Sequence, residues 1–349
     1  MKVLSRKRSR NSKARASIVH DVKTALDAID MIGHSKKDAR KEGIKGIHSL
    51  KQKSNSMSDC QNFVKWVRAE HGVRKLDHLT EQHYKAYFAY LEDKGISKGH
   101  MINVETSLRL LEHGHKMASE ERESDFAGFC TENRLYVLER NESLQNRSYE
   151  RWEIDAIKKQ VSAEVSKAVD LMSQLGLRVK EAVNIRVEHF MAKNGGRQLN
   201  IPDKKGAGIT KGGRFREVDV PKDFVESLQS FLTGKEPTDR LVAVSYDTVR
   251  KGVHIACKKA GIEQAGRGCH GFRHSYARDR FAQLASAEQK NMMDRILDNQ
   301  SIGRKADYGM VSEHDKELYE SARAVMNQVH SELGHGNNRW RLAMVYLRE

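Results

Sequence analysis

Residues 269–276 read Cys-His-Gly-Phe-Arg-His-Ser-Tyr, and the interpretation of the whole chain starts from this stretch. It follows a turn rich in glycine, and Phe272 and Tyr276 then recur at the spacing of one helical face. A helix start presents free backbone N–H groups and favours anions. Because His270 and Arg273 lie three residues apart, they share one face of the first turn. The local chemistry predicts a phosphate site, although an isolated His-x-x-Arg is more often an ordinary basic helix start.

The composition favours a partner that carries negative charge. The chain has 349 residues, enough for two domains, and its 62 Lys and Arg against 47 Asp and Glu give a formal charge of +15. Such an excess is typical of proteins that bind nucleic acid, although ribosome-associated and merely basic proteins share it. The mean hydropathy is −0.71, and no apolar run or secretory signal is visible. We expect a cytoplasmic protein associated with the nucleoid.

Neither a disulfide framework nor a bound metal is predicted. The four cysteines are widely spaced and include no Cys-x-x-Cys pair. His270 and His274 are one helical turn apart and could hold zinc together with Cys257 or Cys269, but no acidic third ligand or His-Glu-x-x-His accompanies them. No Walker-type phosphate loop is present, so ATP is not implied. We therefore expect a protein without a cofactor.

The first 140 residues predict a basic tail followed by a helical domain. Residues 1–17 contain no acidic residue and should form a flexible tail whose Arg6, Lys7, Arg8 and Arg10 can lie along phosphates. From residue 18 to residue 140, apolar side chains recur at helical spacing, and their aromatic members are interpreted as core rather than as platforms for bases. Four helical stretches are predicted there, around residues 18–29, 60–67, 84–91 and 101–111.

A polar connection at residues 140–147 marks the predicted domain boundary, so that the second domain spans residues 141–349. A single long helix is expected from Trp152 to Leu175, ended by Gly176, and a short helix should follow Leu177. Further helical spacing appears at residues 224–228, 249–257 and 318–329, whereas residues 282–317 show no clear pattern.

One part of this second domain alternates as a β-hairpin does. Residues 198–201 and 215–220 alternate in polarity, and they flank a segment rich in glycine and lysine that places Lys211 close to the second strand. The expected fold class is therefore mostly α with a small antiparallel β-sheet. Lys204, Lys205 and Arg214 add positive charge to this hairpin and are predicted to bind DNA.

Six residues, each in a distinctive neighbourhood, carry a family resemblance. The neighbourhoods are Leu-Gly-Leu-Arg-x-x-Glu, Thr-Lys-Gly-Gly-Arg-x-Arg-Glu-Val, His-Gly-Phe-Arg-His and Leu-Gly-His, followed by a late tyrosine. In this order the chain resembles the tyrosine recombinase/integrase family, the site-specific recombinases similar to phage integrases. The resemblance covers roughly residues 150–349. It matches the family's catalytic set to Arg178, Lys211, His270, Arg273, His335 and Tyr346.

The resemblance implies a helical, SAM-like core-binding domain followed by a mixed α/β catalytic domain. Two guanidinium forks, Arg178 and Arg273, suit the non-bridging oxygens of a phosphodiester, and Glu181 is expected to orient Arg178. A tyrosine has a pKa of about 10 and needs a base to become a nucleophile at neutral pH. His270 is our candidate for that base, acting on Tyr346.

The remaining two roles follow from the family alone. Lys211 would protonate the leaving 5′-oxygen, with Lys204 and Lys205 as rivals for that role, and His335 would donate to a phosphate oxygen. Tyr308 and Tyr319 are alternative late tyrosines, but Tyr319 precedes His335, which is the wrong order for this family.

Two spacings depart from the family pattern. Arg273 and His335 are 62 positions apart, which predicts an insertion near residues 285–325, and Tyr346 follows His335 by 11 positions, slightly more than usual. The family commonly carries a further helix after the tyrosine, whereas only three residues follow Tyr346 here. The coupling of protomers is therefore left open.

The resemblance implies an enzyme that breaks and rejoins double-stranded DNA without metal or ATP. It would act as a homotetramer on two DNA sites, through a 3′-phosphotyrosine intermediate and a Holliday junction, to integrate or excise a mobile element. Accessory DNA-bending proteins are compatible with this scheme. Two alternatives stay open, namely a non-catalytic DNA-binding protein with the same fold and a metal-dependent nuclease.

Overall fold

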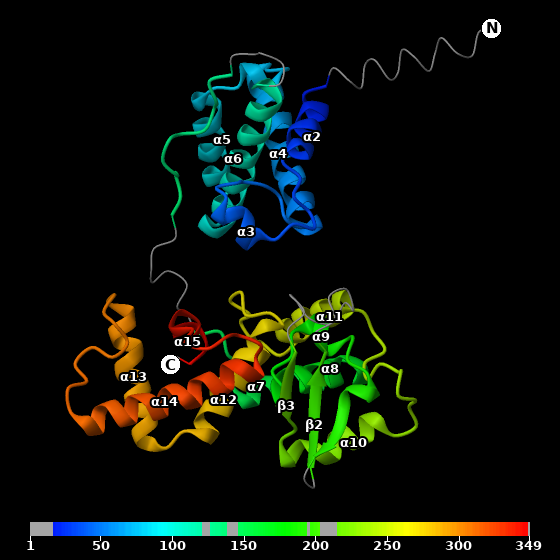
Figure 1. Ribbon diagram of the computed structural model, residues 1–349. Coiled ribbons are helices and arrows are strands. Elements are labelled where there is room, and N and C mark those ends of the chain that lie inside the picture. The colour runs from blue at the N-terminus through cyan, green and yellow to red at the C-terminus, as the bar shows by residue number, and fades with distance from the viewer. Residues whose placement is uncertain (1–16, 121–125, 138–145, 194–195, 203–214, 348–349) are drawn as a thin grey trace. The chain divides into compact units, whose positions relative to one another are not determined.

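The computed structural model describes residues 17–120, 126–137, 146–193, 196–202 and 215–347. The chain divides into two compact units, Met1–Glu139 and Arg140–Glu349, each with its own hydrophobic core (Figure 1). None of the described helices combines the length and apolar character that crossing a membrane requires.

The described part of the first unit is a helical bundle. Its α-helices are α2 (Ile18–Ala28), α3 (Lys36–Lys41), α4 (Leu50–His71), α5 (Glu81–Asp93) and α6 (Lys98–Glu120), with a 3₁₀ turn at Leu76–His78. Helices α2, α4 and α6 pack against one another. The four predicted helices are confirmed, and the short helix α3, which has one buried residue, Ala39, was not predicted.

The centre of this bundle is aromatic, as predicted. Phe63, Tyr84, Phe88 and Phe129 are among the largest fully buried side chains. Phe63 and Phe129 stack with ring centroids 5.7 Å apart, and Tyr84 and Phe88 meet edge to face at 5.0 Å. These rings are core packing, which leaves them unavailable as platforms for bases.

The second unit contains nine described α-helices and one sheet. The helices are α7 (Arg151–Lys159), α8 (Ala163–Gln174), α9 (Val179–Ala182), α10 (Val225–Leu232), α11 (Tyr246–Lys259), α12 (His270–Leu284), α13 (Ala287–Ser301), α14 (Glu313–Glu332) and α15 (Trp340–Tyr346). Two 3₁₀ turns lie at Val187–His189 and Lys222–Phe224.

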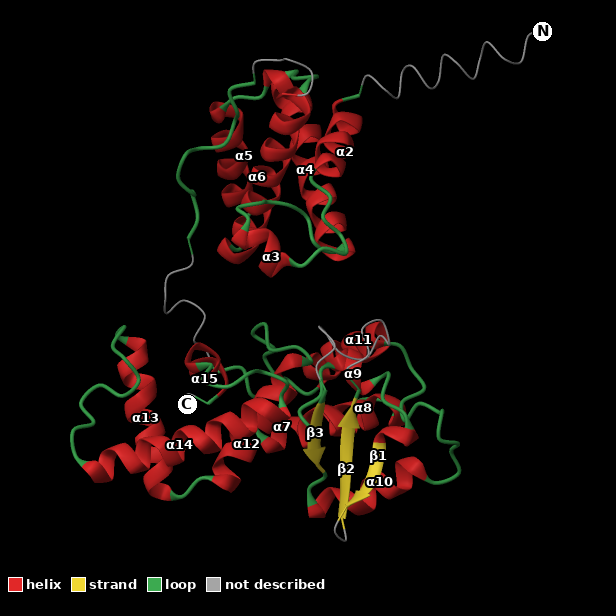
Figure 2. Cartoon of the chain, in the orientation of Figure 1, coloured by secondary structure: helices red, strands yellow, loops and turns green. Residues whose placement is uncertain are grey.

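The sheet has three antiparallel strands in the order β1 (Phe190–Lys193), β2 (Gly196–Ile201) and β3 (Arg216–Asp219), drawn in yellow in Figure 2. Leu199 pairs with Phe190 on one side and with Val218 on the other, so one face joins the core. The predicted strands are therefore present as β2 and β3. Strand β1 was not predicted, because only one of its four residues is buried and no alternation shows.

The prediction of one long helix from Trp152 to Leu175 is wrong. The segment forms two helices, α7 and α8, that break between Lys159 and Ala163. Ser162 adopts extended backbone angles at the N-cap of α8, and a serine at this position favours a new helix start. Helix α11 packs against both pieces, so the apolar pattern continues through the break.

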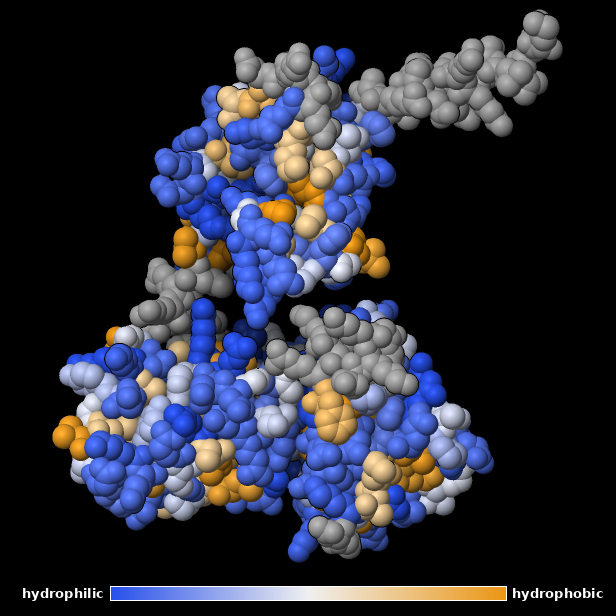
Figure 3. All heavy atoms as spheres, viewed as in Figure 1, coloured by the Kyte–Doolittle hydropathy of each residue, from blue (hydrophilic) through white to orange (hydrophobic). Residues whose placement is uncertain are grey.

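Helix α12 is the central element of the second unit and contacts α8, α14 and α15. Seven consecutive residues, Gly271–Ala277, are buried along it. Residues 282–317, which showed no pattern, contain α13, and this helix packs on α14 and α15. The visible face of each unit is mostly hydrophilic with small scattered apolar patches (Figure 3).

Candidate active site

Arg273 is a fully buried residue of α12. Its Nη1 donates to the carbonyl oxygen of Gly176 at 2.5 Å, and its Nη2 donates to the carbonyl oxygen of Leu333. Burial, followed by the charge of Arg178, lowers the pKa of Arg273 to about 10, so the guanidinium keeps its charge at neutral pH. The two carbonyls belong to the ends of α8 and α14, and they fix the orientation of the fork.

Gly176 is required at its position for two reasons. Its φ is +62°, a conformation that residues with a Cβ rarely adopt. A Cβ built there would lie 2.5 Å from the ring of Tyr276. Glycine therefore allows the chain to turn after α8 and to present its carbonyl to Arg273.

Glu181 joins two further arginines beside this fork. Its carboxylate accepts hydrogen bonds from Arg178 Nη1 at 2.8 Å and from Arg216 Nη2 at 2.6 Å. It also accepts from the backbone N–H of Arg178 at 2.8 Å, and it lies 3.9 Å from Arg273 Nη1. Burial would raise the pKa of Glu181, but the positive charges of Arg216 and Arg178 outweigh it and hold the pKa below its usual value.

This cluster has an excess of positive charge. Arg178, Arg216 and Arg273 surround one described carboxylate, Glu181, which leaves two positive charges without a counter-ion. Arg216 is 5% exposed and Arg273 is 0% exposed, so water screens them poorly. An anion is the ligand that such a cluster favours.

Tyr346 at the end of α15 meets His270 at the start of α12. The phenol oxygen lies 2.8 Å from His270 Nε2, within hydrogen-bond distance. His270 is exposed at the surface, but the surrounding protein partly desolvates its imidazole, and this, followed by the charge of Arg273, lowers its pKa to about 4. The imidazole is therefore neutral at pH 7 and can accept the phenol proton.

His274 supports the phenol ring from the next turn of α12. Its ring stacks on Tyr346 with centroids 4.1 Å apart and an interplanar angle of 6°. Burial lowers the pKa of His274 to about 3, so it packs as a neutral aromatic. This contact shows that the side chain His274 packs against is Tyr346.

His335 lies beside Arg273, just after α14. Its Nε2 is 3.2 Å from Arg273 Nη2, and its ring centroid is 5.0 Å from that of Tyr346. A guanidinium only donates, so His335 Nε2 accepts and the proton of the neutral ring lies on Nδ1. Burial and the charge of Arg273 lower the pKa of His335 to about 2. In this geometry Nε2 does not donate.

Comparison with solved structures identifies the fold of the chain. No protein-family model and no curated protein matches the sequence. The fold is similar to the XerH site-specific recombinase bound to its difH substrate, with a TM-score of 0.51 and 15% identity over 95% of this chain and 91% of that chain. This chain adopts the tyrosine recombinase fold.

Two more solved structures agree with this fold. A lambda integrase dimer bound to a COC′ core site gives a TM-score of 0.50 and 14% identity over 81% of this chain and 75% of that chain. The Tn1549 transposon integrase in complex with a circular intermediate DNA gives 0.50 and 9% identity, over 96% of both chains. The predicted fold class is thereby confirmed.

Within the tyrosine recombinase fold, five of the six matched residues form one cluster. They are Arg178, His270, Arg273, His335 and Tyr346, and Glu181 joins them. Lys211, Lys204, Lys205 and Arg214, as well as Arg6, Lys7, Arg8 and Arg10, lie outside the described residues.

The rival tyrosines have other neighbours. Tyr319 packs on Trp340 with ring centroids 5.9 Å apart, and Tyr308 lies under the guanidinium of Arg304 at 4.4 Å. The described residues contain no group of three His, Cys, Asp or Glu side chains placed to hold a metal ion.

Sequence reasoning missed Arg216 and His330. Arg216 follows the hairpin segment, and its position as an inward residue of β3 is the pattern that could have identified it. His330 is fully buried on α14, with its ring 5.5 Å from that of His335. It reads as an ordinary apolar position of that helix, so no motif distinguishes it.

Proposed function

We propose that this protein is a site-specific DNA recombinase that cleaves and rejoins strands through a covalent 3′-phosphotyrosine intermediate. The observation that carries the proposal is the contact of 2.8 Å between Tyr346 Oη and the neutral His270, next to an arginine cluster with excess positive charge. A phenol nucleophile, a base and an anion site are the three parts that phosphoryl transfer to a tyrosine requires. The similar solved structures are site-specific recombinases and integrases bound to DNA.

Cleavage would begin with a phosphodiester held by Arg178 and Arg273. As Tyr346 Oη attacks phosphorus, His270 Nε2 takes the phenol proton, the new P–O bond forms and the bond to the 5′-oxygen breaks. The two guanidinium groups stabilise the charge that develops on the non-bridging oxygens, a contribution worth about 10²- to 10³-fold for each such donor in other enzymes.

The leaving 5′-oxygen needs a proton, which we assign to Lys211 by its place in the family pattern. His335 is assigned to a phosphate oxygen. Because its Nε2 now accepts from Arg273, donation from Nε2 requires that the ring proton move to Nε2 and that Arg273 Nη2 turn to another acceptor when phosphate binds. The protonated ring nitrogen of His335 should therefore differ between the free protein and the protein with DNA bound.

Rejoining reverses these steps with the 5′-hydroxyl of another strand as nucleophile, and the phosphotyrosine bond conserves the energy for it. We extend the proposal to a homotetramer that acts on two DNA sites through a Holliday junction and moves a mobile element. In this scheme the helical first unit and the basic residues outside the described ranges bind the DNA backbone.

The test is the capture of a covalent adduct. The protein is incubated in EDTA with a library of duplexes that carry a nick and a randomised core, and adducts that survive denaturation are isolated and sequenced. We expect adducts from the wild type and from Tyr319→Phe, which is the matched control. Tyr346→Phe lacks the attacking oxygen and should form none.

Three other results would contradict the proposal. Specific DNA binding without an adduct would indicate a non-catalytic DNA-binding protein. Cleavage that depends on added Mg²⁺ would indicate a nuclease. An adduct from Tyr346→Phe would exclude Tyr346 as the nucleophile.

A further inference from the structure

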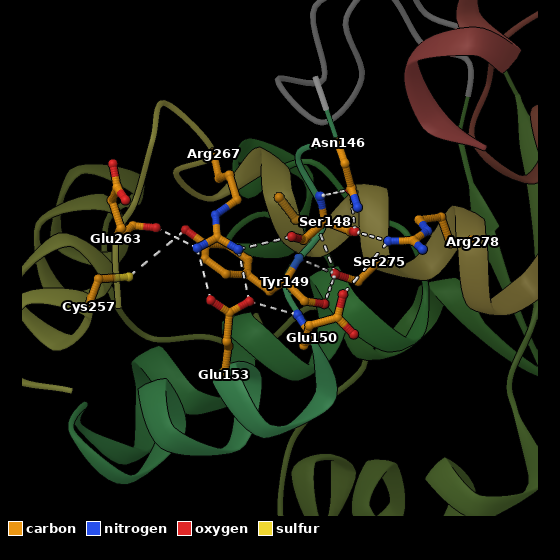
Figure 4. A network of polar contacts seen from close by, with 11 residues as sticks. Asn146, Ser148, Tyr149, Glu150, Glu153, Cys257, Glu263, Arg267, Ser275 and Arg278 are labelled. Carbon is orange, nitrogen blue, oxygen red and sulfur yellow. Dashed lines mark hydrogen bonds and ion pairs between the residues drawn. The ribbon is translucent and has the colours of Figure 1, made fainter. Parts of the chain in front are cut away.

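The chain enters the second unit along the helix that carries His270 and Arg273. Figure 4 shows this entry segment, residues 146–150, beside the side chains that hold it. The backbone N–H of Tyr149 donates to Ser275 Oγ at 2.8 Å, and Ser275 Oγ donates back to the carbonyl of Tyr149 at 2.7 Å. Arg278, one turn further along α12, donates to Ser148 Oγ at 2.5 Å. The entry segment is therefore fixed to α12 by reciprocal bonds.

Arg267 holds the same segment from the other side (Figure 4). It donates to the carbonyl of Ser148 at 3.0 Å and pairs with Glu153 at 2.8 Å, and its guanidinium lies 4.4 Å above the ring of Tyr149. The Tyr149 ring packs in turn on Phe272, with centroids 4.7 Å apart. These contacts leave the backbone before Tyr149 little freedom to move relative to α12.

Gly271 lets this backbone lie directly on the first turn of α12. A Cβ at this position would come within 2.8 Å of the carbonyl oxygen of Arg147 and within 2.5 Å of the Tyr149 ring. Gly271 is the immediate neighbour of His270, so the backbone of Arg147 lies against the turn from which the candidate base projects.

The side chain of Arg147 is exposed, and its charge reaches the site. Among the described residues, no carboxylate pairs with its guanidinium and no hydrogen-bond partner is found for it. Its positive charge is one of the causes that lower the pKa values of His270 and His274. An unpaired guanidinium on a fixed backbone, beside a cluster already rich in arginine, favours an anion rather than another protein group.

We propose that Arg147 binds a DNA backbone phosphate next to the one that Tyr346 attacks. This inference rests on the function proposed above. Arg147 would place the strand relative to His270 and Tyr346, so we define it as a positioning residue. The backbone of Arg147 is held in place by the contacts that Ser275, Arg278 and Arg267 make with the residues following it. The proposal gives this polar network a function, which is to fix Arg147 beside the first turn of α12.

The test uses a duplex recovered by adduct capture and three variants of the full chain. Arg147→Gln removes the charge and should slow adduct formation about tenfold, and Arg147→Lys should slow it less, since a lysine keeps the charge without the fork. Lys316→Gln removes one exposed charge from α14 as the matched control and should react as the wild type does. The melting temperature of Arg147→Gln should not change, because the side chain is exposed.

Neutral methylphosphonate linkages identify the phosphate concerned. One such linkage next to the cleaved phosphate should slow the wild type and should not slow Arg147→Gln any further, because the variant has already lost the contact. If Arg147→Gln reacts as fast as the wild type, or if every neutral linkage slows both proteins equally, the inference is wrong although the proposed function stands.

If the wild type forms no adduct, the proposed function fails and a binding measurement decides the inference. On a random-sequence duplex, the loss of one phosphate contact lowers the slope of log K against log salt by about 0.9. Arg147→Gln should show that decrease and Lys316→Gln should not. Equal slopes in the two variants would overturn the inference.

Discussion

One glutamate in each unit, Glu105 and Glu181, is at most 1% exposed, and the two differ in what surrounds them. Glu105 of the first unit is 0% exposed and accepts from Tyr84 Oη at 3.0 Å and from Arg109 Nε at 3.2 Å. It also accepts from the backbone N–H groups of Leu135 and Tyr136, at 2.9 Å and 3.2 Å. One carboxylate thus meets one guanidinium, and its other lone pairs bind neutral donors.

Glu181 of the second unit is 1% exposed and has three arginines around it instead of one. A balanced buried pair serves the fold alone, since nothing further is needed to neutralise it. An excess of buried positive charge costs stability unless a ligand compensates it. The difference between the two carboxylates therefore indicates which unit holds the site, without reference to any motif.

We expect the largest difference between the units when one arginine beside each glutamate is replaced by lysine, namely Arg273 beside Glu181 and Arg109 beside Glu105. Arg273→Lys keeps the charge but loses the planar fork, and we expect adduct formation to slow by about 10²- to 10³-fold. Arg109→Lys should lower the free energy of unfolding by about 1 to 2 kcal/mol and leave the adduct rate unchanged. Single-turnover adduct kinetics and urea denaturation measure the two effects. Equal kinetic losses in both variants would remove the distinction between the units.

Replacing each glutamate by glutamine sharpens the comparison. Both variants break a buried ion pair, and each should lose about 3 kcal/mol of stability. Glu181→Gln leaves three arginines without a carboxylate among the described residues, so its excess of positive charge is the larger one. Replacing chloride by sulfate should therefore raise the free energy of unfolding of Glu181→Gln more than that of Glu105→Gln or of the wild type. Urea denaturation in the two salts measures this recovery. Identical responses to sulfate would show that the cluster around Glu181 does not bind anions.

The smallest expected effect concerns buried histidines. The first unit buries His115 with Asp77 at 2.8 Å, whereas His274 and His330 of the second unit have no carboxylate partner among the described residues. Burial lowers the pKa of His330 to about 4 and that of His274 to about 3, below the unfolded value of about 6.5.

The sign of this effect follows from proton binding. Below pH ~6.5 the unfolded state binds more protons, so each histidine contributes stability above that pH, which is lost at about 1.4 kcal/mol per pH unit as the pH falls. His330→Leu should remove the contribution of one histidine to the dependence of the free energy of unfolding on pH. His314→Leu, an exposed replacement on the same helix, is the control. Urea denaturation between about pH 5 and pH 7 measures both slopes, and an unchanged slope in His330→Leu would contradict the prediction.

The helices with a full apolar face were predictable from the sequence. Ile18, Val22 and Leu26 recur at helical spacing and are buried on one side of α2. Where the secondary structure depended on the backbone angles of a few residues, the spacing of apolar residues did not predict it. The break at Ser162 interrupts a continuous apolar series, and β1 buries one residue, so neither leaves a periodic signal.

The sequence by itself determined the types of residue available for chemistry and their order along the chain, together with the class of fold. Only the tertiary structure brought Arg178, His270, Arg273, His335 and Tyr346 together, and it alone revealed Arg216 and the fixed backbone of Arg147. The physical reason is that local spacing governs helix faces, whereas an excess of charge around Glu181 and the contact between His270 and Tyr346 arise from elements far apart in the chain. The opening stretch at residues 269–276 predicted a phosphate site, and the fold supplies the other side chains such a site needs.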